Sequence, residues 1–333
     1  MTTVQTIREP LRQARELVLS PLRDQVDGLP PATRRLVRHH FGWTGAGTGA
    51  VGKLLRPALT LACAEAVGGT AREAVPAAVA VELVHNFSLI HDDLIDQDAT
   101  RRHRPTVWHE HGTAAAVLAG NALLALGIGT VAGSGPPGGQ PVLVSAVQEM
   151  IVGQLADSSF EHRADVTREE SLLAAEGKTG ALMGAACALG ALSGGGDTTQ
   201  AEHLRTFGRH LGIAFQAADD LLGIWGDPAL TGKPVGADLV VRKKSLPVVA
   251  ALTSGTPAGA ELAARYHRED PYTAEDVRRS TRLVVEAGGR AWCERQAVEH
   301  LALADQALQA VAPGQEAAGK LAGLTALVVG RDH

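Results

Sequence analysis

Helical periodicity extends through nearly the whole chain, and patterns typical of strands are scarce. Segments rich in Ala, Leu and Glu repeat apolar residues three and four positions apart, which is the spacing of one helix face. Alternating runs of Val, Ile, Thr and aromatic residues are few, and only 3% of the residues are aromatic. These patterns predict an all-α fold. The predicted helices span residues 5–25, 53–68, 74–96, 113–132, 142–163, 168–192, 200–224, 245–253, 258–267, 274–287, 290–312 and 316–329.

No segment of the sequence has the composition of a linker between domains. The breaks between helices are short and rich in glycine, as at 45–52, 133–139 and 226–236, and no internal repeat is present. A chain of 333 residues with a 45% hydrophobic composition is long enough to bury a large core. We therefore predict one domain over residues 1–333.

Charge and cysteine content exclude several classes of protein. A net charge of -5 leaves no basic stripe to neutralise phosphates of a nucleic acid, so we expect no nucleic-acid partner. Cys63, Cys187 and Cys293 lie far apart without the spacing of a zinc site or a disulfide framework. The first residues mix Arg and Glu and lack the apolar core of a secretory signal. These features favour a cytoplasmic protein.

One uncharged stretch, residues 112–133, is long enough to cross a membrane. It consists mostly of Ala and Gly and contains Asn121, and uncharged helices of this kind also form the centre of large helical proteins. We therefore predict a buried helix and no transmembrane segment.

The helix predicted over 74–96 is apolar almost all round and ends in acidic side chains. Asp92, Asp93 and Asp96 form the sequence DDLID. Asp92 and Asp96 lie one turn apart on one helix face, so their carboxylates can converge on a hard divalent cation. Mg²⁺ suits such a site because it keeps several waters and shares its ligands with substrate phosphates. By itself, such a motif is more often a solvated helix end.

A second acidic pair ends another apolar helix. Asp219 and Asp220 follow Phe215 and Gln216 in the sequence FQAADDLLG. Two helices that each end in paired aspartates are hard to explain as two solvated ends. We predict that the two pairs face each other across a cavity and hold a diphosphate through Mg²⁺.

Cationic side chains beside glycines complete a set suited to phosphate groups. Arg offers a planar fork for phosphate oxygens and Lys a point charge, and neighbouring glycines let the backbone approach. Any one of these residues alone is more often part of a surface ion pair, but this explanation is poor for all of them together. They are Lys53 and Arg56 in GKLLRP, Arg101 and Arg102 after DDLID, Lys178 and Thr179 in GKTGAL, and Lys233 and Lys243 in GKPVGADLVVRKK.

These motifs resemble those of the trans-isoprenyl diphosphate synthases, a family that includes farnesyl and geranylgeranyl diphosphate synthases. GKLLRP, ELVHNFSLIHDDLIDQDATRR, GQLAD, GKTGAL, FQAADDLLG and GKPVGADL occur in the family's order and approximate spacing. The resemblance implies a helical bundle around a central cavity, a homodimer, and transfer of an allylic group to isopentenyl diphosphate.

The resemblance also implies a role for each matching residue. The implied ligands of three Mg²⁺ ions are Asp92, Asp96 and Asp219, supported by Asp93 and Asp220. The residues implied to hold isopentenyl diphosphate are Lys53, Arg56, His85 and Arg102. Those implied to hold the allylic diphosphate are Arg101, Lys178, Lys233 and Lys243, with Thr179 and Gln216 at the reacting centre and Phe215 beside the substrate.

Three positions depart from the family's motifs. Gly223 stands where the second acidic motif normally has a third aspartate, and we expect this change to alter Mg²⁺ affinity without abolishing activity. His103 replaces a glycine on which the chain normally turns, and Ser245 replaces a threonine.

Product length is predicted from the residues just before the first acidic motif. Phe87 precedes Asp92 by five residues, which places it about 7.5 Å down the helix. In the resembling enzymes, an aromatic residue there with Ser88 beside it is typical of a geranylgeranyl (C20) product. Farnesyl (C15) synthesis and a terpene cyclase on the same fold are the alternatives, and Phe87 as a simple core residue is another explanation.

Overall fold

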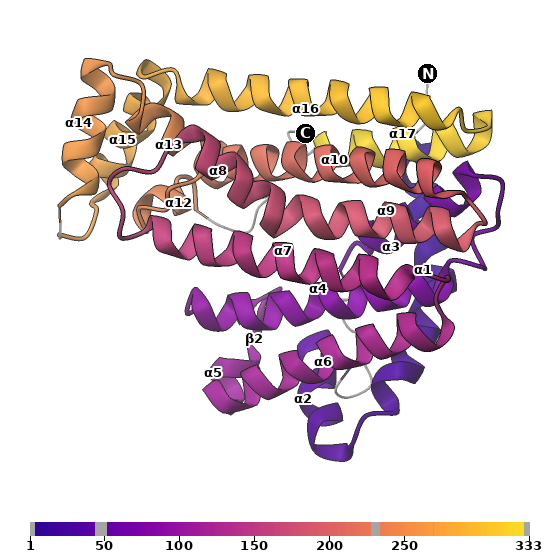
Figure 1. Ribbon diagram of the computed structural model, residues 1–333. Helices are drawn as coiled ribbons and strands as arrows, with labels where there is room; N and C mark the ends of the chain where they lie inside the picture. The colour runs from indigo at the N-terminus through magenta and orange to yellow at the C-terminus, as the bar shows by residue number, and fades with distance from the viewer. Residues whose placement is uncertain (1–3, 44–51, 228–233, 269, 330–333) are drawn as a thin grey trace. The chain divides into compact units, whose positions relative to one another are not determined.

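The computed structural model describes residues 4–43, 52–227, 234–268 and 270–329, and nearly all of them lie in helices (Figure 1). Within these ranges the only strands are β1 (Thr100–Arg101) and β2 (Arg104–Pro105), which pair in an antiparallel hairpin. The all-α prediction is confirmed. The remaining elements are α1 (Val4–Asp27), α2 (Pro31–Phe41), α3 (Leu55–Ala66), α4 (Val75–Ile95), α5 (Val107–His111), α6 (Thr113–Ser134), α7 (Gly139–Phe160), α8 (Arg168–Ala175), η1 (Glu176–Gly180), α9 (Ala181–Ser193), α10 (Thr198–Trp225), α12 (Ala237–Val240), α13 (Leu246–Leu252), α14 (Pro257–Tyr266), α15 (Ala274–Glu286), α16 (Gly289–Val311) and α17 (Gln315–Val329).

The chain forms two compact units, each assembled from separate stretches. Unit 1 comprises Met1–Val147, Ala185–Arg205 and Ala310–Leu324, and unit 2 comprises the stretches between and after them. The prediction of one domain over residues 1–333 stays a prediction.

In unit 1, α4 is the central helix. It packs along α6 and also contacts α1 and α3, and Figure 1 shows α4 and α6 side by side. Leu83, Val84 and Ile90 are therefore almost completely buried. Close packing depends on Gly127 of α6, because a Cβ there would lie 3.0 Å from the carbonyl oxygen of Ala80. The predicted burial of the helix before the first acidic motif is thus observed.

Helix α6 is the uncharged stretch that the sequence singled out. Only 33% of its most apolar window is buried, along one face that includes Ala116, Leu123 and Val131, while Leu118 is 59% exposed. Among the described residues it is the one helix long and apolar enough to cross a membrane, which is weak evidence for a span. The predicted burial of this helix is therefore found along one face only, and the absence of a transmembrane segment stays a prediction.

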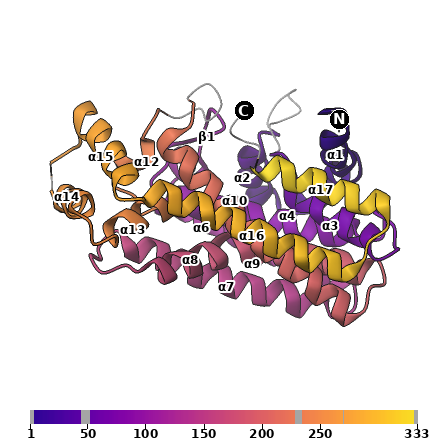
Figure 2. The same cartoon turned by 90° about the horizontal axis from the view of Figure 1, so that it is seen from above.

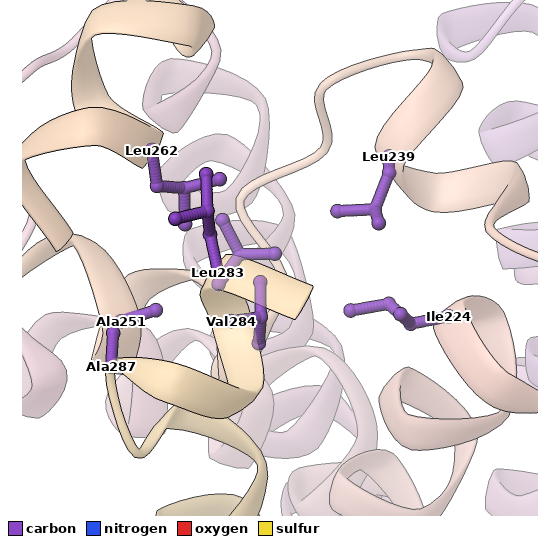
Figure 3. Packing of buried hydrophobic residues seen from close by; sticks show 8 residues of the cluster. Ile224, Leu239, Ala251, Leu262, Leu283, Val284 and Ala287 are labelled. Atoms are coloured by element: carbon purple, nitrogen blue, oxygen red, sulfur yellow. The ribbon is translucent and has the colours of Figure 1, made fainter. Parts of the chain in front are cut away.

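In unit 2, α13, α14 and α15 pack together at one end of α10, as Figure 2 shows from above. Their buried side chains, among them Leu262, Leu283 and Val284, form a hydrophobic cluster with Ile224 of α10 and Leu239 of α12 (Figure 3). A capping box, in which Thr273 and Asp276 satisfy each other's backbone N–H groups, begins α15. Because Leu239 and Ile224 belong to the same cluster, the cluster holds α12 beside the end of α10.

Candidate functional site

The first acidic motif lies at the C-terminal end of α4 in unit 1. Asp92 is half-buried, Asp93 is buried, and Asp96 is exposed just beyond the last turn. The Asp96 N–H donates to the Asp92 carbonyl oxygen at 2.8 Å, so the helical turn that relates the two residues is formed. The three carboxylates therefore share one helix end, as the sequence predicts.

Asp93 is held by an arginine from the hairpin that follows. Arg101 Nε donates to Asp93 Oδ1 at 2.6 Å, while Asp93 Oδ2 is buried and has no hydrogen-bond partner. Burial raises the pKa of Asp93 to about 6, against the opposing effect of the Arg101 charge. A buried carboxylate oxygen without a donor has the chemistry that a bound cation would satisfy.

The β1–β2 hairpin presents Arg102 at its turn. Arg102 and His103 have φ values of 51° and 61°, so both turn residues are left-handed, as in the hairpin turns that match strand twist. Arg104 fixes the hairpin by donating to the carbonyl oxygens of His39 and His40 at the end of α2. His103 thus occupies a conformation that glycine adopts without strain.

Arg56 and His85 lie together near the hairpin. Arg56 Nη1 lies 3.2 Å from His85 Nε2, and because arginine can only donate, His85 accepts through Nε2 and carries its proton on Nδ1. Burial and the Arg56 charge lower the pKa of His85 well below its ordinary value. Lys53, just before α3, is exposed. These three residues and Arg102 are the set predicted for isopentenyl diphosphate.

A buried polar network behind this set was not predicted. Asn86 Nδ2 donates to Glu82 Oε1 at 2.9 Å, and His40 Nε2 donates to Asn86 Oδ1 at 3.0 Å. Burial raises the pKa of Glu82 to about 7, against the charges of Arg56 and Arg102. Burial also lowers the pKa of His40 to about 3. The sequence signal was Glu82 and Asn86, two polar residues one turn apart in a mostly apolar helix.

The two residues predicted to set product length are on α4. Phe87 is 6% exposed, and its ring contacts His91 edge-on at 4.8 Å between centroids. His91 in turn hydrogen-bonds to the Val117 carbonyl oxygen of α6. Ser88 Oγ donates to the carbonyl oxygen of His85 at 2.8 Å. Phe87 is therefore buried on α4 against the histidine that bonds to α6.

In unit 2, Lys178 and Thr179 lie in η1, a π-helical turn that joins α8 to α9. Such turns are frequent at functional sites because they shift side chains relative to an α-helix. Glycines let η1 touch its neighbours: a Cβ on Gly153 of α7 would lie 2.3 Å from the Lys178 backbone nitrogen. On the other side, a Cβ on Gly212 of α10 would lie 2.5 Å from Gly180 Cα.

Lys178 forms an ion pair with Asp157, which the sequence-based prediction missed as a site residue. Lys178 Nζ lies 2.7 Å from Asp157 Oδ2, and both side chains are about three-quarters buried. Asp157 is the acidic residue of GQLAD at the end of α7, so the motif itself was the available signal.

A chain of hydrogen bonds connects η1 to α10 and α13. Thr179 Oγ1 donates to Gln216 Oε1, and Gln216 Nε2 donates to Asp220 Oδ1, both at 2.8 Å. The Leu246 N–H donates to Asp220 Oδ2 at 2.9 Å. Burial raises the pKa of Asp220 to about 6, against Lys243 and the Leu246 N–H. Asp219, the neighbour of Asp220, is exposed, and Phe215 is half-buried.

Several of these residues line a pocket with about 380 Å³ of empty space, part of it open to solvent. Desolvation lowers the pKa of Lys243, but Asp220, Asp238 and other nearby carboxylates outweigh it and raise the pKa above its ordinary value. Ser245 Oγ is buried without a hydrogen-bond partner at the start of α13. Lys233 lies outside the described residues. The lining residues are Asp157, Phe160, Ser171, Ala174, Ala175, Lys178, Gln216, Asp220, Lys243, Lys244, Ser245 and Leu246.

The acidic residues fit a hard divalent cation that also binds a phosphate ligand. Within the described ranges, no three His, Cys, Asp or Glu side chains by themselves form a metal-binding group. Mg²⁺ commonly needs only one or two carboxylates, together with waters and substrate phosphates. The unpartnered Asp93 Oδ2 and the exposed Asp219 provide oxygen ligands of this kind. That the two acidic motifs face each other stays a prediction.

Comparisons with known proteins agree with this chemistry. A family model described as Polyprenyl synthetase matches residues 46–284. The chain is 46% identical to a (2E,6E)-farnesyl diphosphate synthase of Mycobacterium tuberculosis over 86% of this chain and 83% of the relative. It is 46% identical to a geranylgeranyl diphosphate synthase of the same organism, over 81% and 79% of the two chains. A polyprenyl synthase from Caulobacter crescentus, solved with calcium and isoprenyl diphosphate, shares 28% identity with a TM-score of 0.87 over 99% of this chain and 98% of the other.

Proposed function

Because the chain belongs to the polyprenyl synthetase family, we propose that it is a Mg²⁺-dependent synthase that extends an allylic diphosphate with isopentenyl diphosphate. Prenyl transfer itself is the activity that the named relatives share. The observation that carries the proposal is the pocket of unit 2, where Lys178, Lys243 and the unpartnered Ser245 hydroxyl meet Asp157 and Asp220.

The pocket has the chemistry of a site for the allylic diphosphate. Lys178 and Lys243 are cationic side chains in a partly enclosed space, where their attraction for a diphosphate is screened less than in bulk water. Both now interact with carboxylates, Lys178 with Asp157 and Lys243 with Asp220. These carboxylates keep the lysines charged and in position until a diphosphate arrives. Lys233 is part of the same proposal.

Reaction begins when the C–O bond of the allylic diphosphate breaks and pyrophosphate leaves with the bonding electrons. The double bond of isopentenyl diphosphate attacks the resulting carbocation, and pyrophosphate accepts the proton that is lost. When bound, Mg²⁺ would neutralise the charge that develops on the departing pyrophosphate. The chain would hold three such ions through Asp92, Asp96 and Asp219, with Asp93 and Asp220 in support.

The residues of unit 1 suit the second substrate. Arg56 donates to a neutral His85, and Arg102 and Lys53 lie in the adjoining segments, so the set combines fixed positive charge with a polarisable hydrogen-bonding group. We assign isopentenyl diphosphate to this set and place Arg101, which also holds Asp93, with the allylic diphosphate.

We further propose that the product is geranylgeranyl diphosphate. The bulky Phe87 is buried one turn and a half before the first acidic motif, and Ser88 occupies the neighbouring position. A farnesyl product is the second candidate, because relatives of both names are equally identical to this chain. A terpene cyclase is less well supported, because the named relatives are synthases.

The test incubates purified protein with Mg²⁺, isopentenyl diphosphate and, separately, dimethylallyl, geranyl or farnesyl diphosphate. Chain lengths are identified by mass spectrometry after dephosphorylation. We expect a C20 product that Asp92→Ala abolishes and that Phe87→Ala lengthens. The surface variant Asp305→Asn, which removes one carboxylate charge from α16, should leave the product unchanged. A C15 end product from dimethylallyl and geranyl diphosphate, with farnesyl diphosphate left unextended, would refute the C20 assignment. No elongation from any starter would refute the synthase.

A further inference from the structure

Gly223 lies one helical turn after Asp219 on α10, so the two positions share a face of the helix. Gly223 cannot supply an oxygen from a side chain. The space beside it is nevertheless occupied by a carboxylate from another element. A Cβ built on Gly223 would lie 2.2 Å from Asp238 Oδ2 and 2.5 Å from Asp238 Cγ. The Asp238 carboxylate therefore lies against the turn that carries Asp219.

The position of Asp238 is determined by the fold of unit 2. Leu239 and Ile224, the residues that follow Asp238 and Gly223, both belong to the hydrophobic cluster with Leu283 and Val284. Figure 3 shows Leu239 entering this cluster from α12 and Ile224 from α10. Because both neighbours are fully buried, α12 is held against the end of α10.

Two further contacts restrict α12. Gly236 begins it at a φ of 75°, and a Cβ on Gly236 would lie 2.5 Å from Val277 Cγ1 of α15, so the backbone packs directly against that helix. After α12, the Lys243 N–H donates to the Asp238 carbonyl oxygen at 2.9 Å. The segment before Asp238 is therefore fixed by α15, and the segment after it is fixed by the hydrogen bond from Lys243.

The charges around Asp238 connect it to the pocket. Lys243 interacts electrostatically with Asp220, Asp238, Asp157 and Asp219. Asp238 also acts on Asp220, which lines the pocket with Lys243. Because these carboxylates act on the same cationic group, a divalent cation bound beside Asp238 would be stabilised by them as well.

We propose that Asp238 is a metal-binding residue, and that its carboxylate completes the acidic face of α10 that Gly223 leaves without a side chain. The proposal rests on the proposed function, because the cation is the Mg²⁺ that accompanies a diphosphate. Asp238 reaches from α12 to the position where a side chain at 223 would begin, so a Cβ there would displace its carboxylate.

The first test measures Mg²⁺ binding by isothermal titration calorimetry on the full chain with saturating inorganic pyrophosphate. Asp238→Asn keeps the shape of the side chain and removes its charge. We expect it to weaken Mg²⁺ binding by about 10-fold or more, as for other residues that support a metal site. Asp305→Asn is the control, because it removes a carboxylate from an exposed position on α16. Equal Mg²⁺ affinity in Asp238→Asn and the unmodified protein would overturn the proposal.

A second pair of variants separates displacement from loss of charge. Gly223→Ala removes no carboxylate but places a methyl group where Asp238 now lies, so it should also weaken Mg²⁺ binding. Asp238→Ala with Gly223→Asp moves the carboxylate onto α10, and should recover most of the affinity that Asp238→Ala alone loses. Unchanged affinity in Gly223→Ala, or no recovery in the double variant, would contradict the proposal.

The same titration distinguishes this inference from the proposed function. If the unmodified protein takes up no Mg²⁺ with pyrophosphate, the proposed function fails together with the inference. If the unmodified protein binds Mg²⁺ and every variant binds it equally, only the role of Asp238 is lost. Thermal unfolding of each variant confirms that it is folded before its affinity is compared.

Discussion

Glu82 is a carboxylate in the core of unit 1, and its protonation should make stability depend on pH. Burial raises its pKa from 4.5 in the unfolded chain to about 7, so the folded state binds the proton more tightly. The stability that this proton contributes is fully present below about pH 4.5 and is lost as the pH rises through about 7. Glu82 therefore makes the folded protein less stable at pH 8 than at pH 5.

Glu82→Gln should remove this dependence while keeping the oxygen that accepts from Asn86. Relative to the unmodified protein, the variant should gain up to about 3 kcal/mol of unfolding free energy between pH 5 and pH 8. Urea unfolding of both proteins at the two pH values measures the change. The exposed Glu299→Gln serves as the control. If the difference in unfolding free energy between Glu82→Gln and the unmodified protein is the same at pH 5 and pH 8, Glu82 does not have a raised pKa in the folded protein.

Ser245 and Ser171 both line the pocket and are both buried, but their hydroxyls differ. Ser171 Oγ donates to the Arg168 carbonyl oxygen at 2.8 Å, whereas Ser245 Oγ has no partner. Ser245→Ala should therefore leave the unliganded protein as stable or raise its unfolding free energy by about 1 kcal/mol. The same change should weaken pyrophosphate binding, because one donor is lost. Ser171→Ala should instead lower stability and leave pyrophosphate affinity nearly unchanged, as urea unfolding and calorimetry would show.

At the scale of elements, the β1–β2 hairpin turns on two residues that are not glycine. His103 has a φ of 61°, a conformation that costs a residue with a Cβ about 1 kcal/mol. His103→Gly removes this strain but increases the entropy of the unfolded chain, so we expect a net gain in unfolding free energy below about 1 kcal/mol. His109→Gly, on the helical α5, should destabilise the protein. Urea unfolding measures both, and equal destabilisation would mean that His103 is unstrained.

The contact between α7 and η1 depends on a glycine, Gly153, and substituting this glycine tests the contact. At Gly153 a Cβ would lie 2.3 Å from the Lys178 backbone nitrogen. Because that nitrogen belongs to the backbone, no rotation of a side chain could relieve the clash. Gly153→Ala should therefore cost about 1 to 3 kcal/mol of unfolding free energy and move Lys178 away from Asp157. The matched change Gly319→Ala, on α17 with nothing within 4 Å, should stabilise the protein. Thermal unfolding gives the stabilities, and a crystal structure of the variant gives the Lys178–Asp157 distance.

At the scale of the whole molecule, the sequence predicts local patterns well and long-range contacts poorly. The acidic ends of α4 and α10 were predictable because each motif lies within one or two turns of a single helix. The hydrogen bond between His40 and Asn86 joins residues 46 positions apart, and no local pattern encodes it. The contact of Asp238 with Gly223 also depends on how α12 packs.

Some helices could not be predicted correctly from local sequence patterns either. Helix α2 was not predicted because its arginines and histidines dilute the apolar spacing, leaving Val37 and Phe41 as its main buried apolar residues. The helix predicted over 168–192 is instead α8, η1 and α9, because the glycines of EGKTG let a π-helical turn form against neighbouring backbones.

The exposed face of α6 bears on how copies of the chain associate. Val117 and Leu118 are 38% and 59% exposed, and the helix carries no charged side chain from residue 113 to residue 134. Monomeric soluble proteins seldom leave a large contiguous apolar face in water. We propose that a second copy covers this face in a homodimer, as the family resemblance implies.

A charge on this face should separate the two copies. Leu118→Glu buries an unpaired carboxylate at such an interface, which costs several kcal/mol and should shift a dimer to monomers at micromolar concentration in sedimentation equilibrium. Val298→Glu is the matched control, because Val298 is 66% exposed on α16 and outside this face. A monomeric unmodified protein would refute the homodimer. A Leu118→Glu variant that stays dimeric would instead show that another surface joins the two copies.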